Sequence, residues 1–265
     1  TRLNQNNDSK ISINRRNHLE GITKLLFENE NFVICGEAGM GKTHLINELE
    51  LRYNSKFIPF LVLSVESFIN LRIDNFKQLL GFEIEALNDL CDNINHKGVL
   101  VIEGFDALRD DESRGNWKNL INHFVQALNE NWQIALSIRL FDYEKTNWIN
   151  SIFKPKYEIG ILEEPELEDL FNENGDIKRI YEEGNDKLRE ILKIPFYLTL
   201  LKDILLNDSS EGEIQNIKLI KSENDLLSKY WKKRCEDTHN IMPKKEFLWE
   251  LTGKMIEKKE LTIIE

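Results

Sequence analysis

GEAGMGKT, residues 36–43, fits the pattern Gly-x4-Gly-Lys-Ser/Thr, in which a glycine-rich turn joins a buried strand to a helix. The apolar run NFVIC ends at Cys35, directly before the motif, and Leu45, Ile46 and Leu49 follow it at helical spacing. A chance glycine-rich turn rarely has both of these neighbours. The stretch therefore predicts a phosphate-binding loop (P-loop) within an α/β domain.

Each residue type in the motif suits a part of a nucleoside triphosphate. The glycines let the backbone curl so that its N–H groups surround the β-phosphate, and the following helix adds its positive N-terminal end. The lysine brings a point charge to the β- and γ-phosphates, and the Thr43 hydroxyl is a ligand for Mg²⁺. The expected nucleotide-binding residues are Gly36, Glu37, Ala38, Gly39, Met40, Gly41, Lys42, Thr43 and His44, with the His44 backbone near the α-phosphate.

A second motif, VLVIEGFDAL, occupies residues 99–108 and carries four apolar residues followed by Glu103 and Asp106. A buried strand that delivers a carboxylate at its C-terminal end can hold Mg²⁺ and polarise water. We expect Glu103 to hold the metal through a water molecule and Asp106 to orient the attacking water. The alternative is a core strand that ends in a solvated acidic turn.

Apolar runs with strand character recur along the first half of the chain and alternate with helical patterns, as in a parallel sheet. The expected strands are 31–35, 59–65, 99–103, 134–138 and 157–162, and residues 111–129 form an expected helix. From residue 163 onward helical patterns replace the strand patterns. We expect a nucleotide-binding domain at 1–162, a helical lid domain at 163–208 and an incomplete winged-helix-like domain at 209–265. Within this scheme, residues 207–213 form a linker, and 225–235 and 244–258 are helices.

The composition of the 265-residue chain is that of a globular protein, with 41% hydrophobic and 31% charged residues. A formal net charge of −11 disfavours non-specific binding to nucleic acid, although the segment from Asn216 onward is slightly basic.

No apolar run reaches the ~20 residues that span a bilayer, so we expect a cytoplasmic protein without a membrane partner. Cys35, Cys91 and Cys235 form no CxxC pair, which argues against a zinc site. The chain starts without methionine and stops within a strand-like run, LTIIE, so we expect it to be part of something longer.

Four segments together resemble the successive motifs of the STAND class of P-loop ATPases, particularly its NACHT branch, which is related to AAA+ ATPases. They are GEAGMGKT, VLVIEGFDAL, IALSIR ending at Arg139, and KIPFYLTLL around Pro195, and the resemblance covers about residues 10–235. It implies an ASCE-type parallel sheet with strand order 5-1-4-3-2, a helical lid and the start of a winged helix. It also implies ATP or ADP with Mg²⁺ as ligand, Arg139 as the sensor of the γ-phosphate and Pro195 as the residue that packs on the adenine.

Several of these residues have simpler interpretations. Arg139 could be a solvated residue at a strand end, and Pro195 could be an ordinary proline at the first position of a helix. Arg15 and Arg16 resemble a basic position that precedes the P-loop in relatives, but a solvent-facing arginine is an equal alternative. His239 is the nearest candidate for the winged-helix histidine of many relatives, although its polar surroundings, THNIMP, favour a surface residue.

Two departures from the family pattern concern the carboxylates. The metal carboxylate is usually aspartate, whereas this chain has the longer Glu103, and Ala107 stands where an acidic residue is often found. Both departures favour slow hydrolysis.

The sequence therefore favours a nucleotide-controlled switch, the ATPase core of a signalling or antiviral defence protein. We expect it to self-associate on activation, with sensor and effector domains outside this chain. A DNA-handling ATPase of the initiator or loader type is the alternative, supported by a basic cluster beside Trp231 that comprises Lys229, Lys232, Lys233 and Arg234. The simpler interpretation of that cluster is the polar face of a helix whose Leu226, Leu227 and Tyr230 point inward. A nucleotide-binding scaffold that does not hydrolyse its ligand is a third possibility.

Overall fold

The structure, a computed structural model, describes residues 13–28, 30–91, 97–207, 209–236 and 249. Its contacts divide the chain into two compact units. One unit is Asn14–Ile161, and the other consists of the described residues of Thr1–Ile13 and Leu162–Glu265. We refer to them as the sheet unit and the helical unit, and each is described by itself.

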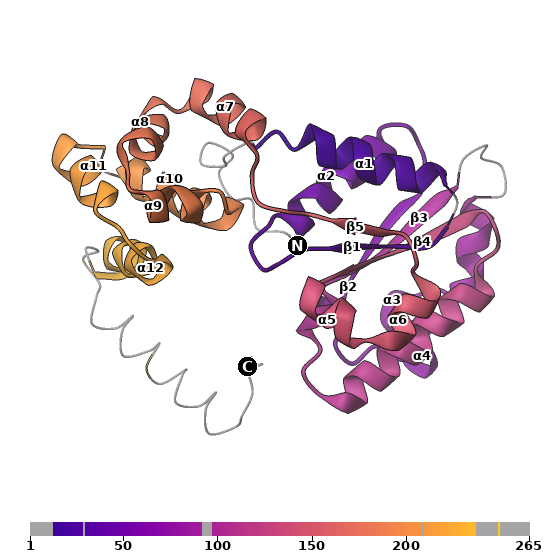
Figure 1. The fold of residues 1–265 in the computed structure, drawn as a ribbon. Helices are drawn as coiled ribbons and strands as arrows, with labels where there is room; N and C mark the ends of the chain where they lie inside the picture. The colour runs from indigo at the N-terminus through magenta and orange to yellow at the C-terminus, as the bar shows by residue number, and fades with distance from the viewer. Residues whose placement is uncertain (1–12, 29, 92–96, 208, 237–248, 250–265) are drawn as a thin grey trace. The chain divides into compact units, whose positions relative to one another are not determined.

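The sheet unit is built on five parallel strands in the order β2-β3-β4-β1-β5 (Figure 1). This is the predicted order 5-1-4-3-2 counted from the other edge, so the predicted fold class is confirmed. The strands are β1 (Phe32–Cys35), β2 (Phe60–Ser64), β3 (Gly98–Glu103), β4 (Trp132–Ile138) and β5 (Lys156–Glu158). The fifth strand is shorter than the predicted 157–162. Only Lys156, Tyr157 and Glu158 pair with β1, and the chain after Ile159 turns away from the sheet.

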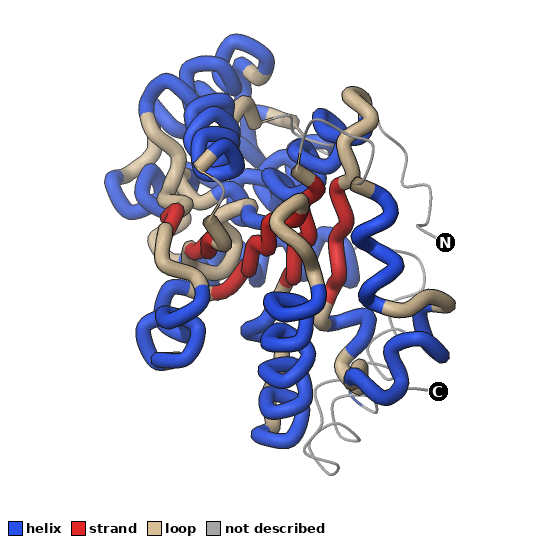
Figure 2. The backbone as a smooth tube through the Cα atoms, turned by 90° about the vertical axis from the view of Figure 1, so that its right-hand side faces the viewer, coloured by secondary structure: helices blue, strands red, loops and turns tan. Residues whose placement is uncertain are grey.

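Successive residues of each strand point to opposite faces of the sheet, and both faces are covered by helices (Figures 1 and 2). Phe32 and Ile34 share a core with α1 (Arg16–Phe27) and α2 (Lys42–Asn54). Val33 and Cys35 share a core with α4 (Asp111–Ala127) on the other face. The elements that complete the unit are η2 (Glu66–Phe68), η3 (Ile73–Asn75), α3 (Phe76–Leu80), η4 (Ile84–Leu90), η5 (Phe105–Ala107), α4 (Asp111–Ala127), α5 (Leu140–Lys145) and α6 (Asn147–Ile152).

The helical unit encloses one hydrophobic core to which Leu167, Ile180, Leu198, Ile217 and Leu226 all belong. Asn185, the N-cap of α9 (Asp186–Leu192), links that helix to the end of α11 (Glu211–Lys218). Its side-chain amide donates to the carbonyls of Lys218 at 3.1 Å and Ile220 at 2.8 Å. The helices are α7 (Glu164–Glu173), α8 (Gly175–Glu183), α9 (Asp186–Leu192), α10 (Pro195–Asn207), α11 (Glu211–Lys218) and α12 (Glu223–Trp231), followed by the π-helical turn η6 (Lys232–Glu236).

The predicted linker at 207–213 is wrong for most of its length. Helix α10 continues to Asn207 and α11 already begins at Glu211. The Ser210 hydroxyl accepts from the backbone N–H of Glu213 at 3.3 Å, which makes Ser210 the N-cap of α11. The same small and acidic residues that indicate a linker thus serve here as a helix start.

Two predictions concern residues outside the described part of the chain, namely the helix at 244–258 and the strand-like end LTIIE. The boundary between residues 208 and 209 also stays a prediction, although the described residues on both sides share one core. Within the part of the chain that the structure covers, no helix is long and apolar enough to cross a membrane.

The largest fully buried side chain among the described residues of the sheet unit supplies a test of this core. Trp117 on α4 is fully buried, and its indole N–H donates to the Ile69 carbonyl at 3.3 Å. Trp117→Ala should lower the free energy of unfolding by about 3–5 kcal/mol, because it leaves a cavity and an unpaired carbonyl. Val125→Ala on the same helix, at a half-exposed position, should change it by less than about 0.5 kcal/mol. Urea denaturation of both variants checks this, and equal losses would contradict the assigned core.

Candidate functional site

The P-loop connects the carboxyl end of β1 to the N-terminus of α2, as predicted. Gly39 and Gly41 have positive φ values of 81° and 87°, which glycine adopts without steric cost. Gly41 is also the N-cap of the 13-residue helix α2, whose first residues are Lys42 and Thr43. The unpaired N–H groups of that first turn form an anion-binding end of the helix.

The Lys42 side chain folds back over its own loop. Its ammonium donates to the carbonyls of Gly36 at 2.6 Å and Glu37 at 3.1 Å. The pKa of Lys42 lies below its usual value, mainly because the side chain is buried. The negative charge of Asp106 works against this lowering, and the positive charge of Arg139 adds to it. All three charged groups therefore act on one another at the end of the sheet.

Asp106 and Arg139 meet because β3 and β4 are neighbours in the sheet. Gly104, with a φ of 77°, turns the chain after Glu103 into η5, which carries Asp106. Arg139 directly follows β4 and is the N-cap residue of α5. Its Nε lies 2.6 Å from Asp106 Oδ2, but the N–H does not point along that line, so the contact is an ion pair rather than a hydrogen bond.

Glu103, the last residue of β3, has a buried carboxylate oxygen, Oε1, that finds no hydrogen-bond partner within the described residues. Buried polar atoms are normally satisfied, so this oxygen has capacity to accept from a ligand. A water bound to Mg²⁺ is a suitable donor, and the Thr43 hydroxyl is exposed at the start of α2. No group of three or more metal-binding side chains occurs in the described ranges.

Arg15, whose role the sequence left open, is buried with 1% of its surface exposed. Its guanidinium donates to the carbonyls of Met40 at 2.7 Å and Gly160 at 2.9 Å. The neighbouring Arg16 is exposed and pairs with Glu20 at 2.8 Å, so the solvent-facing interpretation holds for Arg16 alone. Sequence could not separate the two arginines, because the burial of Arg15 depends on where the chain leaves β5.

The beginning of the P-loop also packs tightly on the exit of β5. A Cβ atom added at Gly36 would lie 2.6 Å from the carbonyl oxygen of Ile159, and the Ile159 N–H donates to the Cys35 carbonyl at 2.7 Å. The neighbouring atom is backbone, so it cannot move aside without distorting the pairing of β1 with β5. The packing therefore favours glycine at position 36.

The nucleotide-binding roles of Pro195 and His44 stay predictions. Pro195 is the buried first residue of α10 in the helical unit, a position where proline is favoured in any helix. His44 is exposed, and its ring lies 4.0 Å from the Glu48 carboxylate one turn further along α2. His239 lies outside the described residues.

The predicted basic cluster is largely matched by acidic side chains. Lys229 and Lys233 lie 3.2 and 3.6 Å from the Glu213 carboxylate. Arg234 pairs with Asp203 at 2.9 Å. Leu226 is buried as expected, whereas Leu227 is 37% exposed, so the prediction that Leu227 points inward is wrong.

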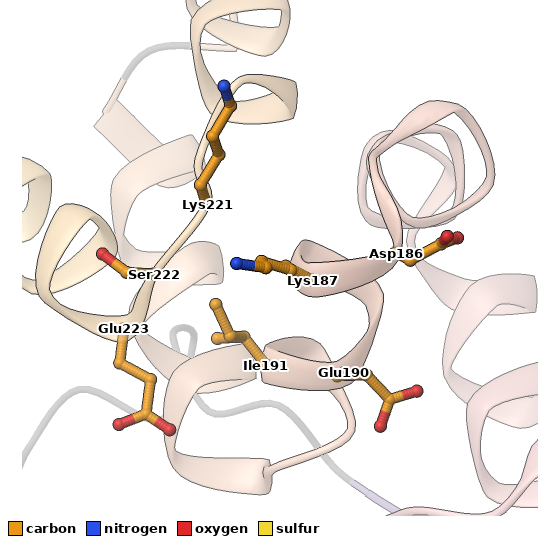
Figure 3. A pocket seen from close by; sticks show the side chains of 7 residues that line it. All are labelled: Asp186, Lys187, Glu190, Ile191, Lys221, Ser222 and Glu223. Carbon is orange, nitrogen blue, oxygen red and sulfur yellow. The ribbon is translucent and has the colours of Figure 1, made fainter.

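The helical unit has a shallow pocket of about 330 Å³ that contains no predicted site residue. In Figure 3, Lys187 and Ile191 point toward the segment 221–223, whereas Asp186 and Glu190 point away from it. Those two carboxylates pair with Arg189 and Lys193 on their own helix or directly after it. The lining thus mixes charges of both signs without a convergent set of donors or acceptors.

No protein-family model matches this sequence, and no curated protein matches it either. Three solved structures are similar in fold: ORC1 of Aeropyrum pernix in complex with DNA, a DNA replication initiation factor, and a mutant of RuvB from Thermotoga maritima. Their sequence identities to this chain are 15%, 16% and 14%, with TM-scores of 0.46, 0.44 and 0.44. The matches cover 83%, 80% and 82% of this chain, and 65%, 57% and 69% of the respective structures.

This chain thus spans less than two thirds of the ORC1 and initiation-factor chains. Likeness at this level concerns the arrangement of the fold alone. What the structure itself defines is a five-stranded parallel sheet whose P-loop, acidic strand end and arginine follow three adjacent strands, β1, β3 and β4.

The close approach at Gly36 gives a direct test of the P-loop geometry. Gly36→Ala should lower the free energy of unfolding by about 1–3 kcal/mol, because the new Cβ forces the Ile159 carbonyl away from β1. Gly115→Ala on α4 meets no atom within 4 Å and should stabilise the chain by about 0.5–1 kcal/mol. Thermal unfolding of the two variants measures the difference, and a Gly36→Ala protein as stable as the parent would refute the close packing.

Proposed function

We propose that this chain is a nucleotide-binding switch, the ATPase core of a STAND protein of the NACHT type, which binds ATP or ADP with Mg²⁺. The observation that carries the proposal is the convergence of Lys42, Asp106 and Arg139. They follow three adjacent strands, and their charges act on one another beside the N-terminus of a 13-residue helix. A triphosphate with its metal needs this combination of a helix N-terminus, fixed cations and one or two carboxylates.

The roles of the residues follow from this placement. The N–H groups of residues 36–43 surround the β-phosphate, and Lys42 exchanges its loop carbonyls for phosphate oxygens. Mg²⁺, held by the Thr43 hydroxyl and through water by Glu103, would neutralise charge on the β- and γ-phosphates. Asp106 accepts a hydrogen bond from the attacking water and orients it. Arg139 stabilises the negative charge that develops on the γ-phosphate oxygens.

Hydrolysis in this scheme is slow for reasons that lie in the same residues. Asp106 Oδ2 lies 2.6 Å from Arg139 Nε. The carboxylate that would orient the water is therefore also engaged by Arg139, the proposed sensor of the γ-phosphate. Glu103 reaches the water shell of the metal from a longer stem than aspartate, and Ala107 offers no second carboxylate. Positioning supplies most of the catalysis in phosphoryl transfer, so loose positioning lowers the rate.

In this proposal the helical unit is the lid of the switch and Pro195 packs on the adenine. Exchange of ADP for ATP opens the lid, and opening permits self-association in a signalling or antiviral defence role. The support is the order of motifs along the sequence, together with a proline at the start of a helix in a compact unit that directly follows the sheet unit. Sensor and effector domains outside this chain belong to the same proposal.

A DNA-handling role receives less support from the basic cluster. Three of its four cations lie within 4 Å of a carboxylate of the same unit, namely Lys229 and Lys233 with Glu213, and Arg234 with Asp203. Cations engaged in this way offer less charge to a phosphate backbone, whose binding depends on free lysines and arginines. The non-hydrolysing scaffold differs from the switch only in the rate of turnover.

Nucleotide binding predicts a stability change that depends on Lys42. Mg·ADP at about a hundred times its Kd should raise the free energy of unfolding by ~2.7 kcal/mol. Lys42→Ala should remove most of this gain, because a charged partner of buried phosphates is worth ~2–5 kcal/mol. Lys56→Ala, at an exposed position after α2, should keep the gain. Calorimetric melting with and without nucleotide measures it, and equal shifts in all three proteins would show that the P-loop is not the site.

Slow hydrolysis predicts that two substitutions separate binding from turnover. The parent chain should hydrolyse Mg·ATP well below the ~10 s⁻¹ typical of enzymes. Asp106→Asn should lower the single-turnover rate further by ~10²–10⁴-fold and leave nucleotide affinity intact, whereas Thr43→Ala should weaken the Mg²⁺-dependent binding itself. Asp74→Asn at an exposed site is the matched control. A parent rate of tens per second, or an unchanged rate in Asp106→Asn, would contradict the assigned roles.

A further inference from the structure

A buried arginine outside the P-loop makes more contacts with backbone than the proposed chemistry requires. The guanidinium of Arg15 donates to three carbonyls: Met40 at 2.7 Å, Gly160 at 2.9 Å and Ile161 at 3.4 Å. The same side chain is 1% exposed. A buried cation is expensive unless it is fully engaged, so these contacts are strongly maintained.

The contact with Met40 fixes the apex of the P-loop. In a planar trans peptide the carbonyl of one residue and the N–H of the next point in opposite directions. Arg15 holds the Met40 carbonyl on its own side, and the N–H of Gly41 therefore points the other way. Gly41 is the N-cap of α2, so this N–H belongs to the set that would face the phosphates.

The contacts with Gly160 and Ile161 lie at the opposite end of the sheet unit's sequence. Ile161 is the last residue of that unit, and the helical unit begins at Leu162. A second set of contacts links Arg15 to β5 through the His18 ring. His18 Nε2 lies 2.8 Å from the Arg15 guanidinium, and His18 Nδ1 lies 3.2 Å from the hydroxyl of Tyr157 on β5. One guanidinium thus joins the P-loop to the segment 159–161, which we call the connector.

We propose that Arg15 is a positioning residue for nucleotide binding, which fixes the Met40–Gly41 peptide in its binding orientation and joins the P-loop to the connector. The inference rests on the proposed function and adds a coupling to it. A change at the Met40–Gly41 peptide on nucleotide binding reaches Gly160 and Ile161 of the connector through this side chain. The connector is where the chain enters the helical unit. Arginine suits the task because its rigid fork donates to several carbonyls at once, whereas lysine has a single nitrogen.

The test compares three variants of the whole chain by calorimetric titration with Mg·ADP. Arg15→Met should weaken binding by about 10–100-fold, the loss expected when a charged hydrogen-bond donor is removed. Arg15→Lys retains the charge and a donor for one carbonyl, so it should lie between Arg15→Met and the parent. Arg16→Met, one residue further along the chain and exposed, should stay within about threefold of the parent.

A second readout separates coupling from general weakening of the fold. Hydrogen exchange of the connector, residues 159–161, is measured with and without Mg·ADP at about a hundred times the Kd of each variant. The parent and Arg16→Met should show slower exchange of the connector on binding, and Arg15→Met should not. If Arg15→Met does not fold, Arg15→Lys carries the same comparison, with a connector response smaller than that of the parent.

The outcomes distinguish the inference from the function on which it rests. A parent chain that binds neither Mg·ADP nor Mg·ATP overturns the proposed function. A parent that binds, beside an Arg15→Met variant with unchanged affinity, overturns the positioning role alone. If Mg·ADP slows hydrogen exchange of the connector equally in the parent and in Arg15→Met, or in neither protein, the coupling is overturned.

Discussion

The insertion of β4 between β1 and β3 is the constraint on which the candidate site depends. Because Cys35 pairs with Ile138 and Ile102 pairs with Leu136, the carboxyl ends of the three strands lie side by side. The P-loop, Arg139 and the Glu103–Asp106 turn then follow from neighbouring strand ends. No local feature of any one segment could bring them together, since Lys42 and Asp106 are 64 positions apart and Asp106 and Arg139 are 33 positions apart along the chain.

At this edge of the sheet the Lys42 ammonium donates to backbone carbonyls of its own loop. Lys42 and Arg139 act on each other and on Asp106, and burial lowers the pKa of Lys42. A phosphate placed against the ammonium would oppose this lowering, because a nearby negative charge favours the protonated form. The contacts of Lys42 with the Gly36 and Glu37 carbonyls are the weaker, neutral substitute for such a partner.

The sequence predicted the parallel sheet, the P-loop between β1 and α2 and, through family resemblance, the strand order, since these depend on local pattern and a specific motif. It could not decide between Arg15 and Arg16, because burial of an arginine depends on a distant segment, the exit of β5. The Asp106–Arg139 ion pair was also beyond reach, although both residues were singled out, because their separation depends on the turn at Gly104. The linker prediction failed where Ser210 caps a helix, since small polar residues are common to linkers and helix starts.

The most direct test of a nucleotide-binding switch is to identify and count the nucleotide released when purified protein is denatured. Our account predicts ADP at close to one molecule per chain, and none from the Lys42→Ala variant prepared in parallel. The contradicting result would be a parent protein that releases no nucleotide and also fails to take up added Mg·ADP or Mg·ATP. In that case the loop at residues 36–43 would be a structural turn, and the convergence of Lys42, Asp106 and Arg139 would need another explanation.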